Sequence, residues 1–177
     1  MKIMIVSDIH GDATCTEKFL SIFKSEGCDR LIILGDILYH GPRNDLPAGY
    51  APKRVIELLN PLKDVITAIN GNCDAEVDQM VLDFPILPDP QRVEIDGKEA
   101  LLTHGHKYDF DEEKCLVLHG HTHILRAEKN EHNTVIVNPG SVSIPKGGNP
   151  NSFAILHDGI ITVYDFDMNA IKSIHIE

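Results

Sequence analysis

Five short motifs rich in aspartate, asparagine and histidine constrain this 177-residue chain more than any other feature. Each motif follows a short apolar run of the kind that forms a strand buried on both faces of a sheet. The motifs are Asp8-x-His10, Gly35-Asp36, Gly71-Asn72, His104-Gly105-His106 and His121-Thr122-His123. A single motif of this kind occurs by chance, but five of them at predicted strand ends indicate one shared polar site.

The first half of the chain alternates predicted strands with predicted helices. Apolar runs predict three buried strands, at Ile3–Val6, Leu31–Leu34 and Val65–Ile69. Thr14 and Glu17 fit a capping box at the start of a first helix, and Pro52–Leu59 can form a second. Strand, polar loop, helix and strand in this order predict β-α-β units and a largely parallel sheet.

The second half of the chain changes to short strands in close succession. Arg92–Ile95 and Glu99–Thr103 flank an Asp96-Gly97 pair, which is typical of a two-residue hairpin turn. Further short strands are expected at Cys115–Leu118, Thr134–Val137, Phe153–Leu156, Ile160–Phe166 and Ile171–Ile176. Together these segments predict a predominantly antiparallel second sheet packed on the first, and therefore an α/β sandwich.

Composition limits the classes of protein to which the chain can belong. Its length fits a single domain over residues 1–177. The formal charge of −11 speaks against a partner such as an extended nucleic acid, whose binders need a basic surface to displace counterions. The four cysteines form no C-x-x-C pair, and the N-terminal apolar run is too short for a signal peptide or a membrane span. We therefore expect free thiols, a cytoplasmic location and no membrane partner.

The spacing of the motif side chains is suited to metal binding. In an extended segment residues i and i+2 share a face, so Asp8 and His10 can point at one object, as can His121 and His123. Carboxylate, imidazole and amide oxygen are ligands for divalent ions such as Mn²⁺, Fe²⁺ and Zn²⁺. Cysteine is nearly absent from the motifs, which argues against a structural cysteine-rich zinc site.

The order of the five motifs resembles that of the calcineurin-like metallophosphoesterases. Residues 35–44, the Gly71-Asn72-Cys73-Asp74 motif and residues 138–148 are similar to the bacterial YfcE-type phosphodiesterase subfamily. This resemblance implies a four-layer αββα sandwich, in which two mixed β-sheets are flanked by helices, with two divalent metal ions at one edge. By the same resemblance, Asp8, His10 and His123 would hold the first ion, Asn72, His104 and His121 the second, and Asp36 would bridge them.

The resemblance also implies a reaction, the attack of a metal-bridged hydroxide on a small phosphodiester. Manganese is the expected metal, and Fe²⁺, Zn²⁺ and Ni²⁺ are alternatives that nitrogen and oxygen ligands also admit. Two rival activities would use the same site, those of a phosphomonoesterase and of a nuclease. A third alternative is a non-catalytic scaffold of the retromer-subunit type, in which the ligand set is altered, whereas here it is intact.

Cys73 and Asp74 are the predicted catalytic residues beside the metal ligands. In the wider family an acidic residue at the position of Asp74 orients a preceding histidine, which protonates the leaving group. Here Cys73 stands in place of that histidine, and a thiol is a weaker hydrogen-bond donor to an oxyanion than imidazolium. We therefore expect slow chemistry that favours good leaving groups. The alternative is that Cys73 is a small buried residue without a catalytic part.

Residues outside the ligand set are predicted to shape the substrate side of the site. Arg43 can contact phosphate through two hydrogen bonds, or instead form a structural ion pair or a subunit contact. Lys146 is a second phosphate-binding candidate, and His106 is assigned to the substrate side as a neighbour of the ligands. The segment 107–118 is shorter than in relatives, which should leave one wall of the pocket open. Relatives often assemble, so a homodimer or a homotetramer is a candidate state.

Overall fold

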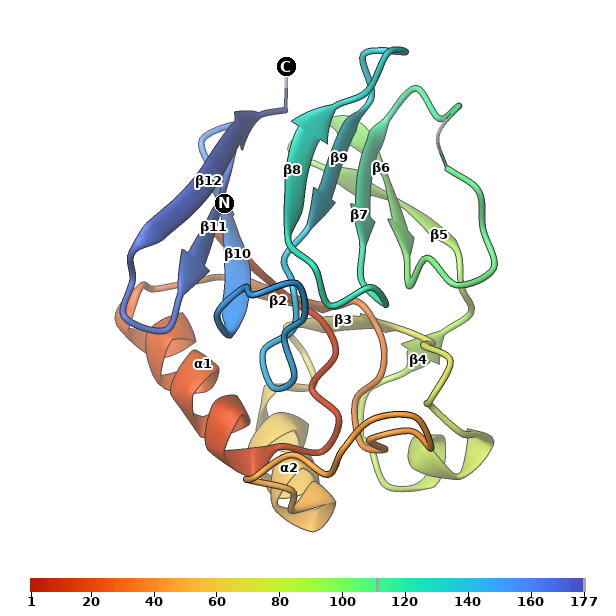
Figure 1. Cartoon of the computed structure of the whole chain (residues 1–177), viewed down its shortest axis with the longest axis vertical. Helices are drawn as coiled ribbons and strands as arrows, with labels where there is room; N and C mark the ends of the chain where they lie inside the picture. Colours follow the sequence, from red (N-terminus) through yellow and green to blue (C-terminus); the bar gives the residue numbers. More distant parts are fainter. Residues whose placement is uncertain (111, 177) are drawn as a thin grey trace.

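The computed structural model describes residues 1–110 and 112–176, which form two packed β-sheets with helices on one side (Figure 1). The seven-stranded sheet contains β1 (Ile3–Val6), β2 (Arg30–Ile33), β3 (Ile66–Ile69), β4 (Ile86–Leu87), β10 (Ser152–His157), β11 (Ile160–Asp165) and β12 (Ala170–His175). The five-stranded sheet contains β5 (Gln91–Ile95), β6 (Lys98–Thr103), β7 (Leu116–His119), β8 (Arg126–Lys129) and β9 (Val135–Asn138). Their spatial orders are β12-β11-β10-β1-β2-β3-β4 and β5-β6-β7-β9-β8.

The seven-stranded sheet combines a parallel half with an antiparallel half. β1, β2, β3 and β4 pair in parallel, as the alternation of apolar runs and helices predicts. β10 pairs antiparallel with β1, and β11 and β12 continue this same sheet. The expectation that these late strands belong to the second sheet is therefore wrong. The apolar pattern of β10 specifies that the strand is buried, but it does not specify a partner.

The five-stranded sheet contains two parallel and two antiparallel pairings. β6 pairs parallel with β7 and β7 with β9, whereas β5 and β8 pair antiparallel at the two edges. The sheet is thus mixed, as the family resemblance implies, and the prediction of predominantly antiparallel pairing is wrong. Because β6 and β7 run in the same direction, the chain between them crosses back over the sheet instead of turning tightly.

The predicted hairpin in this sheet is confirmed. Asp96 and Gly97 join β5 to β6, and their φ angles are 50° and 78°. Two successive residues with positive φ are characteristic of the type I′ turn, whose twist matches that of the flanking strands. The Asp-Gly pair therefore fixes the register in which Ile95 faces Lys98.

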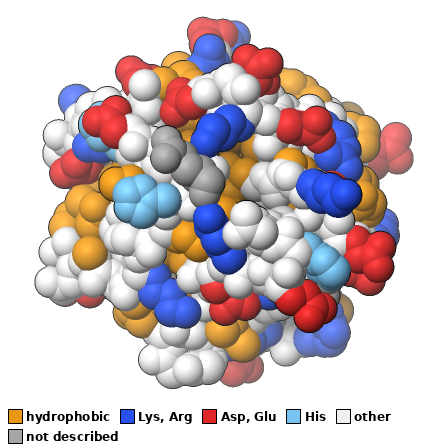
Figure 2. Space-filling model, turned by 90° about the horizontal axis from the view of Figure 1, so that it is seen from above, with side chains coloured by type: hydrophobic (Ala, Val, Ile, Leu, Met, Phe, Trp, Pro, Cys, Tyr) orange, Lys and Arg blue, Asp and Glu red, His pale blue; other side chains and the backbone are white. Residues whose placement is uncertain are grey.

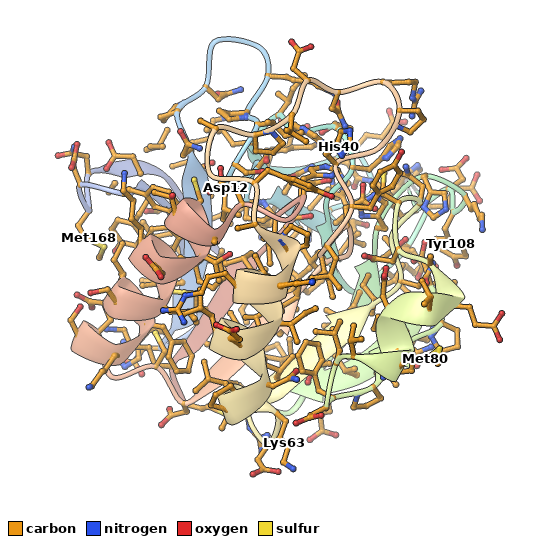
Figure 3. All side chains as sticks on the ribbon, turned by 90° about the horizontal axis from the view of Figure 1, so that it is seen from below. Asp12, His40, Lys63, Met80, Tyr108 and Met168 are labelled. Atoms are coloured by element: carbon orange, nitrogen blue, oxygen red, sulfur yellow. The ribbon has the colours of Figure 1, made fainter. Side chains whose placement is uncertain are left out.

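The helices α1 (Ala13–Ser25) and α2 (Pro52–Leu59) pack beside each other (Figure 1, Figure 3). The N-cap of α1 is Asp12, whose carboxylate accepts a hydrogen bond of 2.8 Å from the N–H of Cys15. The predicted capping box at Thr14 is wrong, because α1 already begins at Ala13 and Asp12, two residues before Thr14, is its N-cap. Two short 3₁₀ segments, η1 (Asn60–Leu62) and η2 (Glu76–Met80), complete the helical elements of the described residues. None of these helices has the length and apolarity needed to cross a membrane.

Alternate residues of the central strands face different cores. Met4 and Val6 of β1 pack in the core beneath α1 and α2, whereas Ile3 and Ile5 pack between the sheets with residues such as Leu102. The outer face of the five-stranded sheet is covered by the segment that follows β6. Side chains of this segment pack on buried side chains of the strands. The segment contributes Tyr108, Phe110 and Cys115, and the strands contribute Leu101, Val117 and Ile136. Each sheet therefore has a covering layer, formed by α1 and α2 on one side and by the described part of segment 107–115 on the other.

The carboxyl ends of the parallel strands in both sheets lie at one end of the sandwich. In Figure 1 the loops that follow β1, β2, β7 and β9 meet near the centre of the view. Backbone hydrogen bonds join the first two loops, because Asp8 N–H donates to Gly35 O at 3.2 Å and His10 N–H to Asp36 O at 2.9 Å. The fold therefore gathers the polar motifs of the sequence in one region.

Candidate metal centre

A first cluster of hydrogen-bond acceptors follows β1 and β7. Oδ1 of Asp8 lies 3.6 Å from Nε2 of His10 and 3.2 Å from Nε2 of His123, and the two nitrogens are 3.2 Å apart. All three side chains are buried. Oδ2 of Asp8 accepts hydrogen bonds from Ser7 Oγ at 2.7 Å and from the N–H of His121 at 3.0 Å, whereas Oδ1 has no hydrogen-bond partner among the described residues. One carboxylate oxygen is therefore anchored, and the other is left for a ligand.

Backbone carbonyls fix which ring nitrogen faces this cluster. Nδ1 of His10 donates to the carbonyl of Tyr39 at 2.8 Å, and Nδ1 of His123 donates to that of Ile144 at 2.7 Å. In each neutral ring Nε2 then carries a lone pair. Lone pairs of two imidazoles and one carboxylate oxygen converge, which is the arrangement that a bound cation requires.

A second acceptor cluster follows β3 and β6. Nε2 of His104 lies 3.1 Å from Oδ1 of Asn72 and 3.4 Å from Oδ2 of Asp36. Nδ1 of His104 donates to the carbonyl of Leu34 at 2.7 Å, so Nε2 again faces the cluster. The ring of His121 lies beside that of His104, with centroids 5.1 Å apart. Acceptors therefore converge here as they do in the first cluster.

Asp36 lies between the two clusters. Its Oδ2 atom is 3.6 Å from Nε2 of His10 and 3.4 Å from Nε2 of His104, while Oδ1 accepts a hydrogen bond of 2.7 Å from the N–H of Cys73. Potential ligand atoms of Asp36, Asp8 and His104 all lie within 4.8 Å of one another. The same holds for Asp36, His10 and Cys73. The structure thus brings the seven predicted ligand residues together, with one oxygen of Asp36 close to both clusters.

The electrostatics of this region favour positive charge. Burial opposes ionisation of Asp8, but the imidazoles of His10 and His123 beside its Oδ1 atom hold the pKa of its carboxyl well below the ordinary value. Burial also opposes the charged form of His104, yet Asp36 and Asp8 raise the pKa of this imidazole to about 9. The carboxylates thus favour the protonated form of a buried imidazole. A divalent cation can neutralise the same carboxylates in place of those protons, which are then released.

Five of the predicted ligands have a left-handed backbone. They are Asp8, His10, Asp36, His121 and His123, with φ angles between 49° and 67°. Non-glycine residues with positive φ are uncommon, and they concentrate at functional sites. Ser141 and Ser143 hold the backbone of Asp8, because both hydroxyls donate to its carbonyl, at 2.8 Å and 2.9 Å. The left-handed backbone of Asp8 is therefore held by two side-chain hydrogen bonds.

Asp74 positions the backbone of two neighbouring loops. Its Oδ2 atom accepts hydrogen bonds from the N–H groups of Asp36 and Gly71, and its Oδ1 atom from that of Ile37, at 2.7–2.8 Å. Gly71 is required here, because a Cβ atom would lie 2.2 Å from Oδ1 of Asp36. The carboxylate of Asp74 therefore faces backbone amides, including that of Asp36, instead of a histidine.

Cys73 lies at the edge of the same region. Its Sγ atom accepts a hydrogen bond of 3.2 Å from the side-chain amide of Asn72. Burial, together with the nearby charge of Asp36, raises the pKa of the thiol to about 12. The thiol therefore stays protonated at neutral pH, so it can donate a proton but is not a nucleophile.

A cavity of about 370 Å³ opens onto the acceptor clusters. Cys73 and four of the predicted ligands line it, together with two cationic side chains, Arg43 and Lys146. Arg43 lies in the loop after β2, which also carries His40 and passes near Asp12 (Figure 3). Lys146 lies in the loop after β9. Both phosphate-binding candidates therefore border the same cavity as the predicted metal ligands.

Asp89 is a residue of this region that the sequence patterns missed. Its Oδ1 atom accepts a hydrogen bond of 3.1 Å from the N–H of His104, and its Oδ2 atom lies 3.5 Å from Nδ1 of His106. The ring of His106 packs against those of His104 and His121, at centroid distances of 5.3 Å and 5.9 Å. Among the described residues, His106 is not one of those that line the cavity. Asp89 thus supports the turn that carries His104. Asp89 could not be identified from the sequence, because the strand before it, Ile86–Leu87, is too short to form a recognisable apolar run.

Several known proteins are similar to this chain in sequence and fold. A family model for the calcineurin-like phosphoesterase superfamily domain matches residues 1–158. Phosphodiesterase YfcE of Escherichia coli strain K12 is 46% identical over 168 residues, which cover 92% of this chain and 91% of that protein. A solved structure of YfcE, a phosphoesterase from E. coli, matches with a TM-score of 0.92 and 43% identity over the full length of both chains. Vps29 of Entamoeba histolytica, solved with zinc, shares the fold with a TM-score of 0.68 and 18% identity over both full chains. This chain therefore belongs to the calcineurin-like phosphoesterase superfamily.

Proposed function

We propose that this protein hydrolyses small phosphodiesters at a centre of two divalent metal ions. The observation that carries the proposal is the position of Asp36, whose Oδ2 atom lies within 3.6 Å of ligand nitrogens from both acceptor clusters. The substrate class is supported by the 46% identity to phosphodiesterase YfcE. Membership of the superfamily supports divalent ions as the cofactor.

The proposed ligands divide between two ions. Asp8, His10 and His123 would hold one ion, Asn72, His104 and His121 would hold the other, and Asp36 would be a ligand shared by the two. When bound, the ions supply a water of lowered pKa and neutralise the charge of the phosphoryl oxygens. We propose manganese as the metal, and the nitrogen and oxygen donors also suit Fe²⁺, Zn²⁺ and Ni²⁺.

The other residues of the site position these ligands and bind the substrate. Asp74 holds Asp36 through backbone amides, and His106 packs behind His104. Cys73 borders the cavity and donates a proton to the oxygen of the leaving group. Because the thiol has a pKa of about 12, it is a weak acid, and substrates with good leaving groups should react fastest.

Hydrolysis of bis-(p-nitrophenyl) phosphate with added Mn²⁺ tests this proposal, with p-nitrophenyl phosphate as the monoester comparison. We expect the diester to react faster and the variants Asp36→Asn and His104→Ala to abolish turnover. His132→Ala, at an exposed histidine, serves as the control and should keep the activity. Activity that survives in Asp36→Asn or His104→Ala contradicts the assignment of two ions. Bound metal without turnover of any phosphoester would favour a non-catalytic scaffold.

We further propose a cytoplasmic location and a small substrate in place of an extended nucleic acid. All four cysteines are free thiols, as is usual in reducing compartments. The formal charge of −11 opposes the approach of a long polyanion. A homodimer or a homotetramer is the proposed assembly, which light scattering after gel filtration measures directly.

A further inference from the structure

The guanidinium of Arg43 has no hydrogen-bond or ion-pair partner among residues 1–110 and 112–176. The other arginines are all engaged: Arg30 by the carbonyl of Asp64, Arg54 by Glu17 and Glu57, Arg92 by Glu99 and Glu113, and Arg126 by Glu128. Arg43 is also the arginine that borders the cavity at the acceptor clusters.

The charge of the protein makes this exception informative. The chain has 27 acidic and 16 basic side chains, so carboxylates are abundant as partners for arginine. Figure 2 shows acidic and basic side chains interspersed on the end of the sandwich opposite the helices. An arginine that stays unpaired in such a protein and borders a cavity is available to an anionic ligand.

Lys146 borders the same cavity from a different loop. Its backbone N–H donates to the carbonyl of His123 at 3.0 Å, which ties the loop after β9 to a predicted ligand. The loop of Arg43 is tied to the site as well, because a Cβ atom on Gly41 would lie 2.8 Å from Sγ of Cys73. Both cations are therefore carried by segments that contact the proposed catalytic centre.

A simple phosphodiester leaves these two cations without a partner. Its scissile phosphate carries one negative charge. In the proposed centre the charge of two divalent ions, reduced by the carboxylates of Asp8 and Asp36 and by a hydroxide nucleophile, would already balance the charge of that phosphate. Arg43 and Lys146 add two further positive charges at the same cavity.

We infer that the substrate carries a second phosphate group outside the scissile phosphodiester, and that Arg43 and Lys146 bind it. This inference rests on the proposed phosphodiesterase function. A dianionic phosphate matches the two positive charges, and the planar guanidinium of Arg43 can donate two parallel hydrogen bonds to its oxygens. Arg43 and Lys146 then determine specificity, because they select phosphorylated diesters over diesters without a second anion.

Two matched substrates test this inference: thymidine 5′-(p-nitrophenyl phosphate) and its 3′-phosphorylated form release the same leaving group from the same diester. With Mn²⁺ present, we expect kcat/KM to be about tenfold higher for the 3′-phosphorylated substrate, mainly through a lower KM. Arg43→Gln and Lys146→Gln should each move this ratio towards one. Lys63→Gln removes the same charge beyond the far end of α2 from His40 and should keep the ratio (Figure 3).

If kcat/KM in the unmodified protein is no higher for the 3′-phosphorylated substrate than for the other, the inference is overturned. It is also overturned if Lys63→Gln lowers this ratio as much as Arg43→Gln and Lys146→Gln do. Hydrolysis of bis-(p-nitrophenyl) phosphate in the same experiment shows that the proposed function survives that result. If no diester is hydrolysed, the proposed function fails and binding decides the inference separately. Calorimetry should then find thymidine 3′,5′-bisphosphate bound about tenfold more tightly than thymidine 5′-monophosphate, and only while Arg43 is present. Equal affinities overturn the inference.

Discussion

Nε2 of His10 lies 3.2 Å from Nε2 of His123, and both rings are held by hydrogen bonds from Nδ1 to backbone carbonyls. When neutral, the two nitrogens present lone pairs to each other and to Oδ1 of Asp8. Buried acceptors that face one another are unfavourable unless positive charge lies between them. Metal binding should therefore be coupled to the stability of the fold.

Addition of Mn²⁺ should raise the melting temperature of the metal-free protein. An ion at about 100 times its Kd stabilises the folded state by about 2.7 kcal/mol, which corresponds to roughly 5–10 °C for a chain of this size. Calorimetry before and after treatment with EDTA measures the shift. His123→Ala should lose most of it, whereas His132→Ala, at an exposed position, should keep it. The same shift in both variants would mean that the stabilising ion binds elsewhere.

Asp74→Asn should lower both stability and turnover. The carboxylate of Asp74 accepts three backbone hydrogen bonds, and an amide at this position would turn a donor towards at least one of those N–H groups. One buried N–H left without a partner costs about 1–3 kcal/mol of unfolding free energy. Urea denaturation measures this loss, and kcat should fall more than KM rises, because Asp36 is displaced. Asp64→Asn, at an exposed aspartate, is the matched control. A stable variant with normal kcat would argue against the positioning role.

Ser143→Ala should weaken metal binding without unfolding the protein. The Ser143 hydroxyl donates to the carbonyl of Asp8, a residue with a φ angle of 55°. Loss of an outer contact that orients a ligand typically reduces metal affinity about 10–100-fold. Calorimetric titration with Mn²⁺ gives the Kd of the variant. Ser173→Ala, on the exposed side of β12, provides the comparison. Equal affinities in the two variants would contradict the effect expected of Ser143.

Cys73→His should raise the turnover of phosphodiesters. The thiol of Cys73 has a pKa of about 12, whereas a histidine at this place would be a better proton donor near neutral pH. The rise should be largest for diesters with poor leaving groups, for which protonation matters most. Cys73→Ser controls for the loss of the sulfur atom alone. An unchanged or lower rate of Cys73→His with every metal tested would show that this position does not protonate the leaving group.

The clustering of the candidate ligands could be predicted because metal binding restricts both residue type and spacing. Asp8 and His10, for example, are two residues apart at the end of an apolar run. The residues that hold these ligands could not be predicted in the same way. Ser141 and Ser143 contact a backbone carbonyl, and Asp89 contacts a backbone N–H. Many residue types can make such contacts, and only the tertiary fold decides which of them do.

The strands were predictable where burial leaves a pattern, and their partners were not. The apolar run of Ile3–Val6 forms β1 over the same residues as predicted. β8 has the polar sequence Arg-Ala-Glu-Lys, and as an edge strand it needs no apolar run. The placement of β10 beside β1 depends on a pairing between residues far apart in the chain, such as Ile5 with Ala154. Local periodicity contains no information on such pairings.

Manganese stoichiometry and spin coupling in the unmodified protein and in Asp36→Asn provide the most direct measurement of a shared two-ion centre. Electron paramagnetic resonance reports whether two Mn²⁺ ions bind per chain and whether they interact. Because Oδ2 of Asp36 lies within 3.6 Å of both His10 and His104, we expect two coupled ions in the unmodified protein. In Asp36→Asn the coupling and the hydrolysis of bis-(p-nitrophenyl) phosphate should disappear together. A single ion per chain in the active protein, or coupling and activity that both persist in Asp36→Asn, would contradict the proposed centre.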